Sequence, residues 1–146
     1  MATAPATISD EEVFAAFPDA MLTRDNIEYF RGLMQRKVLI NRCDDCGYWI
    51  YPHRPLCPEC WSRNITPTEI SGKGTVYQFT ILYQGRPIPG FEYPHLLGGI
   101  EIAEQEGVRY LGPIVNIAHE DVREGMPVEL IWMDIPGGPV AAFQPA

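Results

Sequence analysis

Two Cys-x-x-Cys pairs constrain the fold of this chain more than any other feature. Cys43 and Cys46 form the first pair, Cys57 and Cys60 form the second, and together they are all 4 cysteines of the sequence. A Cys-x-x-Cys turn directs backbone N–H groups at its sulfurs, so two thiolates can face one metal ion. Two such turns predict a closed, tetrahedral four-sulfur site that holds a structural metal. We therefore predict a zinc ribbon built on these four ligands.

Three other uses of the cysteines remain open at this point. Disulfide bonds would need an oxidising compartment, and no signal peptide is evident. A redox-active pair would need one Cys-x-x-Cys at the head of a helix, not two in turns rich in Gly and Pro. Iron is the strongest alternative to zinc, because both cysteine motifs also suit a rubredoxin-like iron site. Ferric iron would make the protein red, whereas zinc would leave it colourless.

Charge and hydropathy restrict the partners of the chain. Its 146 residues carry a formal net charge of −8. This charge opposes binding to nucleic acid, because nucleic-acid-binding proteins depend on clustered Lys and Arg. No apolar run approaches the ~20 residues of a membrane-spanning helix. We expect a cytoplasmic protein that binds neither nucleic acid nor membrane.

Helical patterns precede the cysteines, after a tail over residues 1–9 that we expect to be mobile. Ser9 can cap a short helix that Pro18 ends. A second helix is expected from residue 23 or 25 to residue 34 or 36, with apolar residues at helical spacing. This apolar face could pack on the rest of the chain or contact a partner subunit. Its members proposed for a partner are Ile27, Phe30 and Met34.

Short strands are expected on both sides of the first cysteine pair, at residues 38–42 and 48–51. The aromatic residues of the second strand are predicted to cover the metal and to join the ribbon to the next module. His53 lies between the cysteine pairs and could be taken for a ligand. Since four thiolates are already available, we expect it to be an exposed loop residue.

The chain after residue 71 has the alternating pattern of β-strands. The first strand is long, and its apolar residues Val76, Phe79 and Ile81 do not fall on one face, which predicts a bulge or a bend. Five strands with glycines at the corners predict a barrel of the OB type. The expected strands are 72–83, 95–102, 108–117, 128–133 and 140–143. The fold class is therefore mainly β: N-terminal helices over 1–37, a rubredoxin-like zinc ribbon over 38–66, and a five-stranded OB-fold barrel over 67–146.

Several ordered motifs resemble one known family, the acyl-CoA-associated OB-fold proteins with an N-terminal rubredoxin-like zinc ribbon (DUF35). The match covers roughly residues 25–135. His53 departs from the pattern, because the family often has a second proline there. The motifs that carry the resemblance are Arg42–Gly47, Tyr51–Arg54, Cys57–Cys60, Ser71–Thr80, Glu106–Arg109 and Glu124–Val128.

The resemblance implies an accessory subunit of a thiolase-like enzyme, such as a lipid-transfer-protein-type thiolase or aldolase. The residues that cleave or form the C–C bond of the acyl-CoA thioester would belong to the partner. The resemblance also implies one structural zinc ion per chain and a complex with two copies of each subunit. The residues agree with a non-catalytic role, because the cysteines are committed to metal and no other nucleophile has an evident base. The alternatives are a single-stranded nucleic-acid-binding ribbon/OB protein and a stand-alone thioesterase.

Contacts of this chain with coenzyme A or with the partner would use a few exposed groups. The phosphates of a CoA thioester need cations, and the candidates are Lys73, Arg86 and Arg109. The proline-rich loop 84–94 presents aromatic and aliphatic side chains that suit a protein interface. The interface candidates in and beside this loop are Tyr83, Ile88, Phe91 and Tyr93.

Overall fold

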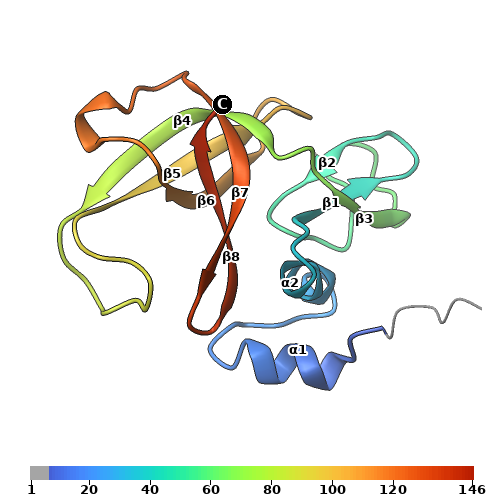
Figure 1. Ribbon diagram of the computed structural model, residues 1–146. Helices are drawn as coiled ribbons and strands as arrows, with labels where there is room; N and C mark the ends of the chain where they lie inside the picture. Colours follow the sequence, from blue (N-terminus) through green and yellow to red (C-terminus); the bar gives the residue numbers. More distant parts are fainter. Residues whose placement is uncertain (1–6) are drawn as a thin grey trace, which may run out of the picture.

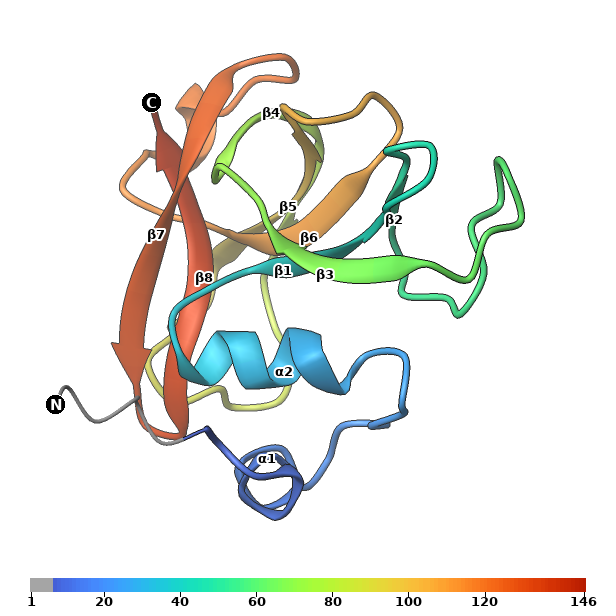
Figure 2. The ribbon, with the colours of Figure 1, turned by 90° about the vertical axis from the view of Figure 1, so that its right-hand side faces the viewer.

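The computed structural model describes residues 7–146, so most of the predicted mobile tail lies outside the described residues. The described chain forms two helices, a three-stranded sheet and a closed five-stranded barrel (Figure 1). The helices and the barrel were predicted, whereas only two of the three ribbon strands were. Figure 2 shows α2 lying along the ribbon strands and the barrel strands β7 and β8, with α1 outside it. The ribbon and the barrel therefore lie side by side, with the helices along one edge of both.

The helix α1 (Asp10–Ala16) begins at the predicted cap. The backbone N–H of Glu12 donates to the Ser9 hydroxyl at 3.2 Å, and the Glu12 carboxylate accepts the backbone N–H of Ser9 at 2.7 Å. The helix α2 (Ile27–Met34) begins later than predicted. The side chain of Asn26 accepts the backbone N–H of Thr23 at 2.7 Å, which holds residues 23–26 in a turn ahead of the helix.

The ribbon contains three antiparallel strands in the order β2-β1-β3. β1 (Leu39–Cys43) and β2 (Trp49–Ile50) are the two strands expected beside the first cysteine pair. β3 (Ile65–Glu69) was not predicted, because it is short, polar and contains Pro67. It pairs with β1 along its whole length, from Leu39 opposite Glu69 to Cys43 opposite Ile65. As an edge strand it tolerates the proline, which removes one backbone donor.

The barrel closes in the order β4-β5-β6-β8-β7, which confirms the predicted five-stranded fold. A bulge between Val76 and Gln78 lies in the first strand, where the sequence predicted it. Closure depends on a parallel contact between Ile114 and Phe143 and on the pairing of Gly74 with Val128. The strands are β4 (Lys73–Leu82), β5 (His95–Ile102), β6 (Arg109–Ile114), β7 (Pro127–Ile135) and β8 (Gly138–Pro145), with a short 3-10 turn, His119–Asp121, before β7.

The ribbon and the barrel share one hydrophobic core. Val38, Ile40 and Trp49 of the ribbon segment belong to the same buried cluster as the inward-facing barrel residues, and Tyr29 and Leu33 of α2 pack against it. The side-chain amide of Gln105 adds two hydrogen bonds, of 2.9 and 3.0 Å, to the backbone of Trp49. The predicted role of the aromatic return strand as a joint is confirmed by these contacts.

Neither helix within residues 7–146 has the length and apolar character that crossing a bilayer requires.

Candidate metal centre

The fold brings the four cysteines together from two turns. Their sulfur atoms all lie within 4.8 Å of one another, with 3.5 Å between Cys43 and Cys60 and 3.6 Å between Cys46 and Cys57. A tetrahedral zinc ion with Zn–S distances near 2.3 Å holds its sulfurs about 3.8 Å apart. The separations are far longer than the ~2.05 Å of a disulfide bond. The four thiols therefore fit one tetrahedral metal ion and form a complete ligand set.

Matching backbone turns place each cysteine pair. The N–H of Gly47 donates to the carbonyl oxygen of Cys43 at 2.9 Å, and the N–H of Trp61 donates to that of Cys57 at 2.9 Å. Both residues after the second cysteine have left-handed φ values, 79° at Gly47 and 64° at Trp61. The glycine adopts this conformation without strain, whereas the tryptophan does not.

The thiols of the cluster titrate unequally. Backbone N–H groups of Cys46 and Asp45 lower the pKa of the Cys43 thiol to about 7, against the effect of burial. The backbone N–H of Tyr48 also acts to lower the pKa of Cys46, but partial burial and the other sulfurs outweigh it and raise that pKa to about 12. The neighbouring sulfurs oppose ionisation of one another. To hold all four as thiolates, the site needs a cation that balances their charge, and a zinc ion would supply it.

The two acidic residues inside the first cysteine pair are engaged in hydrogen bonds away from the sulfurs. The Asp44 carboxylate accepts the Thr66 hydroxyl at 2.8 Å, and the Asp45 carboxylate accepts hydrogen bonds from the side chains of Ser62 and Asn64. Among the described residues, only the four cysteines form a cluster of potential metal ligands. The site therefore has the character of a structural metal centre, in which four thiols complete a tetrahedral ligand set.

His53 is not an exposed loop residue, so that expectation is wrong. Its ring is half-buried and packs against Tyr29 and Tyr51, at centroid distances of 5.2 and 5.7 Å. Its Nε2–H donates to the carbonyl oxygen of Leu39 at 3.2 Å. Tyr29 of α2 therefore covers one side of the imidazole. The histidine lies outside the metal cluster, so it is a packing residue and not a ligand.

The buried position of His53 predicts a pH-dependent stability. Desolvation lowers the pKa of His53 below its ordinary value of 6.5, although the Leu39 carbonyl and Asp25 act in the opposite direction. The unfolded chain then binds the proton first, so the free energy of unfolding falls as pH drops below about 6.5. We expect His53→Gln to remove this part of the pH dependence in urea unfolding at pH 5 and pH 7.5. The matched control is His119→Gln in the 3-10 turn; equal pH dependence in wild type and His53→Gln would contradict the prediction.

A buried pair of tyrosines at the joint was missed by the sequence analysis. The hydroxyls of Tyr29 in α2 and Tyr110 in β6 form a hydrogen bond of 2.7 Å. Burial raises the pKa of Tyr110 to about 12 and also raises that of Tyr29. Both groups are therefore neutral, and each satisfies the other inside the core. No local pattern in the sequence predicts a pair that forms only when the helix packs on the barrel.

The three cations predicted to contact coenzyme A do not converge. Lys73 and Arg109 lie at one end of the barrel, whereas Arg86 lies in the loop beyond the other end of β4. The Arg109 guanidinium stacks on the ring of Tyr77 at 3.5 Å and lies 3.7 Å from the Glu101 carboxylate. These residues therefore do not form one phosphate site in this structure.

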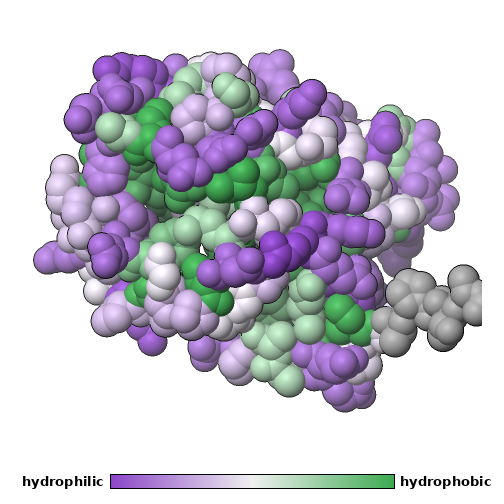
Figure 3. Space-filling view, in the orientation of Figure 1, coloured by the Kyte–Doolittle hydropathy of each residue, from purple (hydrophilic) through white to green (hydrophobic). Residues whose placement is uncertain are grey.

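The predicted interface residues divide into two groups. Ile27, Phe30 and Met34 of α2 are half-buried. The helix packs on the core through two other residues, Tyr29 and Leu33. In the loop, Tyr83 and Ile88 are exposed at 71% and 41%. The other two predicted loop residues, Phe91 and Tyr93, are half-buried and pack on the ring of His95. Figure 3 shows hydrophobic patches over the barrel and over the helices, separated by hydrophilic residues.

Two family models match consecutive parts of the chain. Residues 30–66 match the model described as "ChsH2, rubredoxin-like zinc ribbon domain". Residues 67–133 match "ChsH2, C-terminal OB-fold domain". The two models meet within β3 (Ile65–Glu69), the last strand of the three-stranded sheet.

Curated relatives and solved structures agree with these matches. A "DUF35 domain-containing scaffold protein" of Pyrococcus furiosus is 36% identical over 73% of this chain and 77% of its own length. The "Probable enoyl-CoA hydratase alpha subunit" of Thermomonospora curvata is 32% identical over 94% of this chain, which spans only 43% of that relative. A solved structure titled "Ltp2-ChsH2(DUF35) aldolase" superposes with a TM-score of 0.76 at 33% identity and covers 86% of this chain and 98% of its own. A DUF35 protein from Sulfolobus solfataricus shares the fold, with a TM-score of 0.60 at 21% identity over 93% of this chain and 96% of its own.

Proposed function

Because the chain belongs to the ChsH2 (DUF35) family of proteins with a rubredoxin-like zinc ribbon and a C-terminal OB fold, we propose that it is an accessory subunit of a thiolase-like enzyme. The partner acts on an acyl-CoA thioester and contains the residues that cleave or form the C–C bond. This chain binds the partner and supports it.

One observation carries the proposal: the likeness to the DUF35 chain of the Ltp2-ChsH2 aldolase, which covers 98% of that chain. The names of other relatives point in the same direction. They include a thiolase subunit of Thauera aromatica, 30% identical over 63 residues, and a pregnadiene-carboxyl-CoA hydratase alpha subunit of Mycobacterium tuberculosis, 29% identical over 135 residues. Both of these names describe subunits of enzymes that act on CoA thioesters.

The metal centre would have a structural role in this subunit. Cys43, Cys46, Cys57 and Cys60 would hold one zinc ion per chain, which supplies folding energy to a ribbon that is too small for a core of its own. Four sulfur ligands complete a tetrahedral site, so no coordination position remains for substrate or water. We therefore assign the chemistry of the reaction to the partner. The complex would contain two copies of each subunit.

We expect tagged protein from its native host to co-purify with a thiolase-like enzyme and with one zinc ion per chain. Ile88 is exposed in the loop 84–94, and loss of an anchor residue at a protein interface costs about 2 kcal/mol or more. Ile88→Asp should therefore weaken capture of the enzyme at least tenfold, measured by quantitative pull-down.

Phe14→Asp provides the matched control, because Phe14 is an exposed aromatic on α1, outside the predicted interface. A colourless zinc protein that captures no such enzyme would contradict the proposal and favour the nucleic-acid-binding or thioesterase alternative. A red protein would instead indicate iron in the four-sulfur site.

A further inference from the structure

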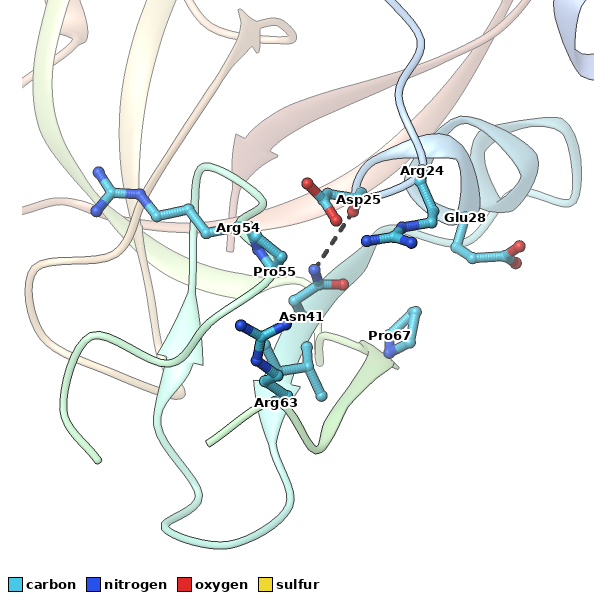
Figure 4. A pocket seen from close by; sticks show the side chains of 9 residues that line it. Arg24, Asp25, Glu28, Asn41, Arg54, Pro55, Arg63 and Pro67 are labelled. Atoms are coloured by element: carbon cyan, nitrogen blue, oxygen red, sulfur yellow. Dashed lines mark hydrogen bonds between the residues drawn. The ribbon is translucent and has the colours of Figure 1, made fainter. Parts of the chain in front are cut away.

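A polar cleft separates the start of α2 from the ribbon strands. It has a volume of about 350 Å³, and its walls include Arg24, Asn41 and Arg63. Figure 4 shows the guanidinium groups of Arg24 and Arg63 on either side of the Asn41 side chain. Asn41 is only 5% exposed, and its Nδ2 donates to the carbonyl oxygen of Asp25 at 3.4 Å. Two cations from distant parts of the sequence thus meet around a buried amide.

The arginines of the cleft are not held in ion pairs by the described part of the chain. Within residues 7–146, Arg24, Arg54 and Arg63 take part in none of the ion pairs. Asp25 also lines the cleft, whereas the carboxylate of Glu28 is bound by Arg31. Unpaired guanidinium groups in a concave site suit phosphate oxygens, which they can bind through two parallel hydrogen bonds.

An apolar pocket adjoins the cleft. It has a volume of about 330 Å³ and is lined by Leu56, Pro58 and Trp61, together with the residues Arg54 and Pro55 that also line the cleft. The two hollows therefore share one wall. A ligand with a charged part and a flat apolar part could occupy both.

Trp61 has no structural reason to be a tryptophan. It occupies the position that Gly47 has in the first turn, with a left-handed φ of 64° that is unfavourable for any residue with a Cβ. Its side chain is 76% exposed, so it contributes little to the core. Strained residues of this kind concentrate at binding sites, and an exposed indole is a platform on which a base can stack.

We propose that the cleft and Trp61 together bind the phosphorylated adenosine end of coenzyme A. The phosphates lie between Arg24 and Arg63, and the adenine stacks on Trp61. This inference rests on the proposed function, which supplies the CoA thioester. It assigns the contact to the ribbon and α2, and not to the barrel cations predicted from the sequence.

The test is a titration of the full-length, zinc-loaded chain with adenosine 3′,5′-bisphosphate, followed by calorimetry and by tryptophan fluorescence. We expect saturable binding that weakens as salt increases, and at least tenfold weaker binding for Arg24→Gln and for Arg63→Gln. Trp61→Phe should abolish the fluorescence change. Trp61→Gly should weaken binding without lowering the Tm, because glycine accepts the left-handed backbone. Inorganic phosphate alone should bind much more weakly than the bisphosphate.

Lys37→Gln is the matched control. Lys37 is exposed, and its substitution removes one positive charge outside the cleft. It should bind like the wild type, and zinc content and Tm identify any variant that is misfolded. Loss of binding in Arg86→Gln but not in Arg63→Gln would overturn the inference. Absence of binding by a chain that still captures its enzyme partner would overturn it too, and would leave the proposed function intact. Binding by a chain that captures no partner would contradict only the proposed function.

Discussion

Cys57→Ser will remove the metal and unfold the two cysteine turns of the ribbon. Cys57 is fully buried, and the small cluster around it consists of Cys43, Ile50 and the partly buried Tyr48 and Ile65. So few apolar contacts cannot hold the two cysteine turns together without the metal, although Val38, Ile40 and Trp49 stay anchored in the core shared with the barrel. Structural zinc contributes about 10–16 kcal/mol in zinc-finger peptides, which is as large as the total stability of many domains. A serine hydroxyl does not replace a thiolate as a zinc ligand at neutral pH.

Metal analysis and hydrogen exchange of the ribbon amides measure this effect. We expect less than one zinc ion per chain and a loss of exchange protection over residues 43–64, whose backbone hydrogen bonds form the two cysteine turns, with smaller losses in the rest of the ribbon and in the barrel. Asp44→Asn is the control, because it removes a carboxylate next to a cysteine without removing a sulfur. Stoichiometric zinc with full protection in Cys57→Ser, or loss of zinc in Asp44→Asn, would show that the ligand set is wrong.

Phe143→Ala will be the most damaging substitution in the barrel. Phe143 is 1% exposed, packs on Tyr110 at a centroid distance of 5.9 Å, and lies at the β6–β8 contact that closes the barrel. Truncation of a buried phenylalanine to alanine costs about 3–5 kcal/mol, since it removes apolar contacts and leaves a cavity. The midpoint of urea unfolding reports the loss.

Phe14→Ala is the matched control for this prediction. Phe14 is 53% exposed on α1, so its removal should change the free energy of unfolding by only about 0.5 kcal/mol. Equal shifts of the urea midpoint in the two variants would contradict the core position of Phe143.

Most of the fold could be predicted because its determinants are local. The spacing of the cysteines predicts the ribbon, Ser9 and Glu12 predict the start of α1, and alternation with glycine turns predicts the barrel strands. The strand β5 has the same bounds as its prediction, His95–Ile102. β3 escaped prediction because its pairing with β1 overrides a polar sequence that contains a proline.

The candidate sites were less predictable where they depend on packing. The ligands of the metal follow from one motif, but the cover over His53 depends on where α2 crosses the ribbon. Arg24 and Arg63 belong to different elements and have no shared pattern, so only the folded chain reveals that they face one cleft. Exposed cations such as Arg86 were the natural candidates from the sequence, because nothing local distinguishes a cation in a cleft from one on a convex surface.

The shared core of ribbon and barrel has a consequence for assembly. Since Val38, Ile40 and Trp49 are buried among barrel residues, the two modules cannot swing against each other. The ribbon and the ends of β4 and β5 from which the loop 84–94 extends are therefore held at one fixed separation. A partner that contacts both must present two receiving surfaces at the same spacing, and it gains the second contact with almost no further loss of conformational entropy. Two contact surfaces at a fixed spacing select partners by their dimensions as well as by their chemistry.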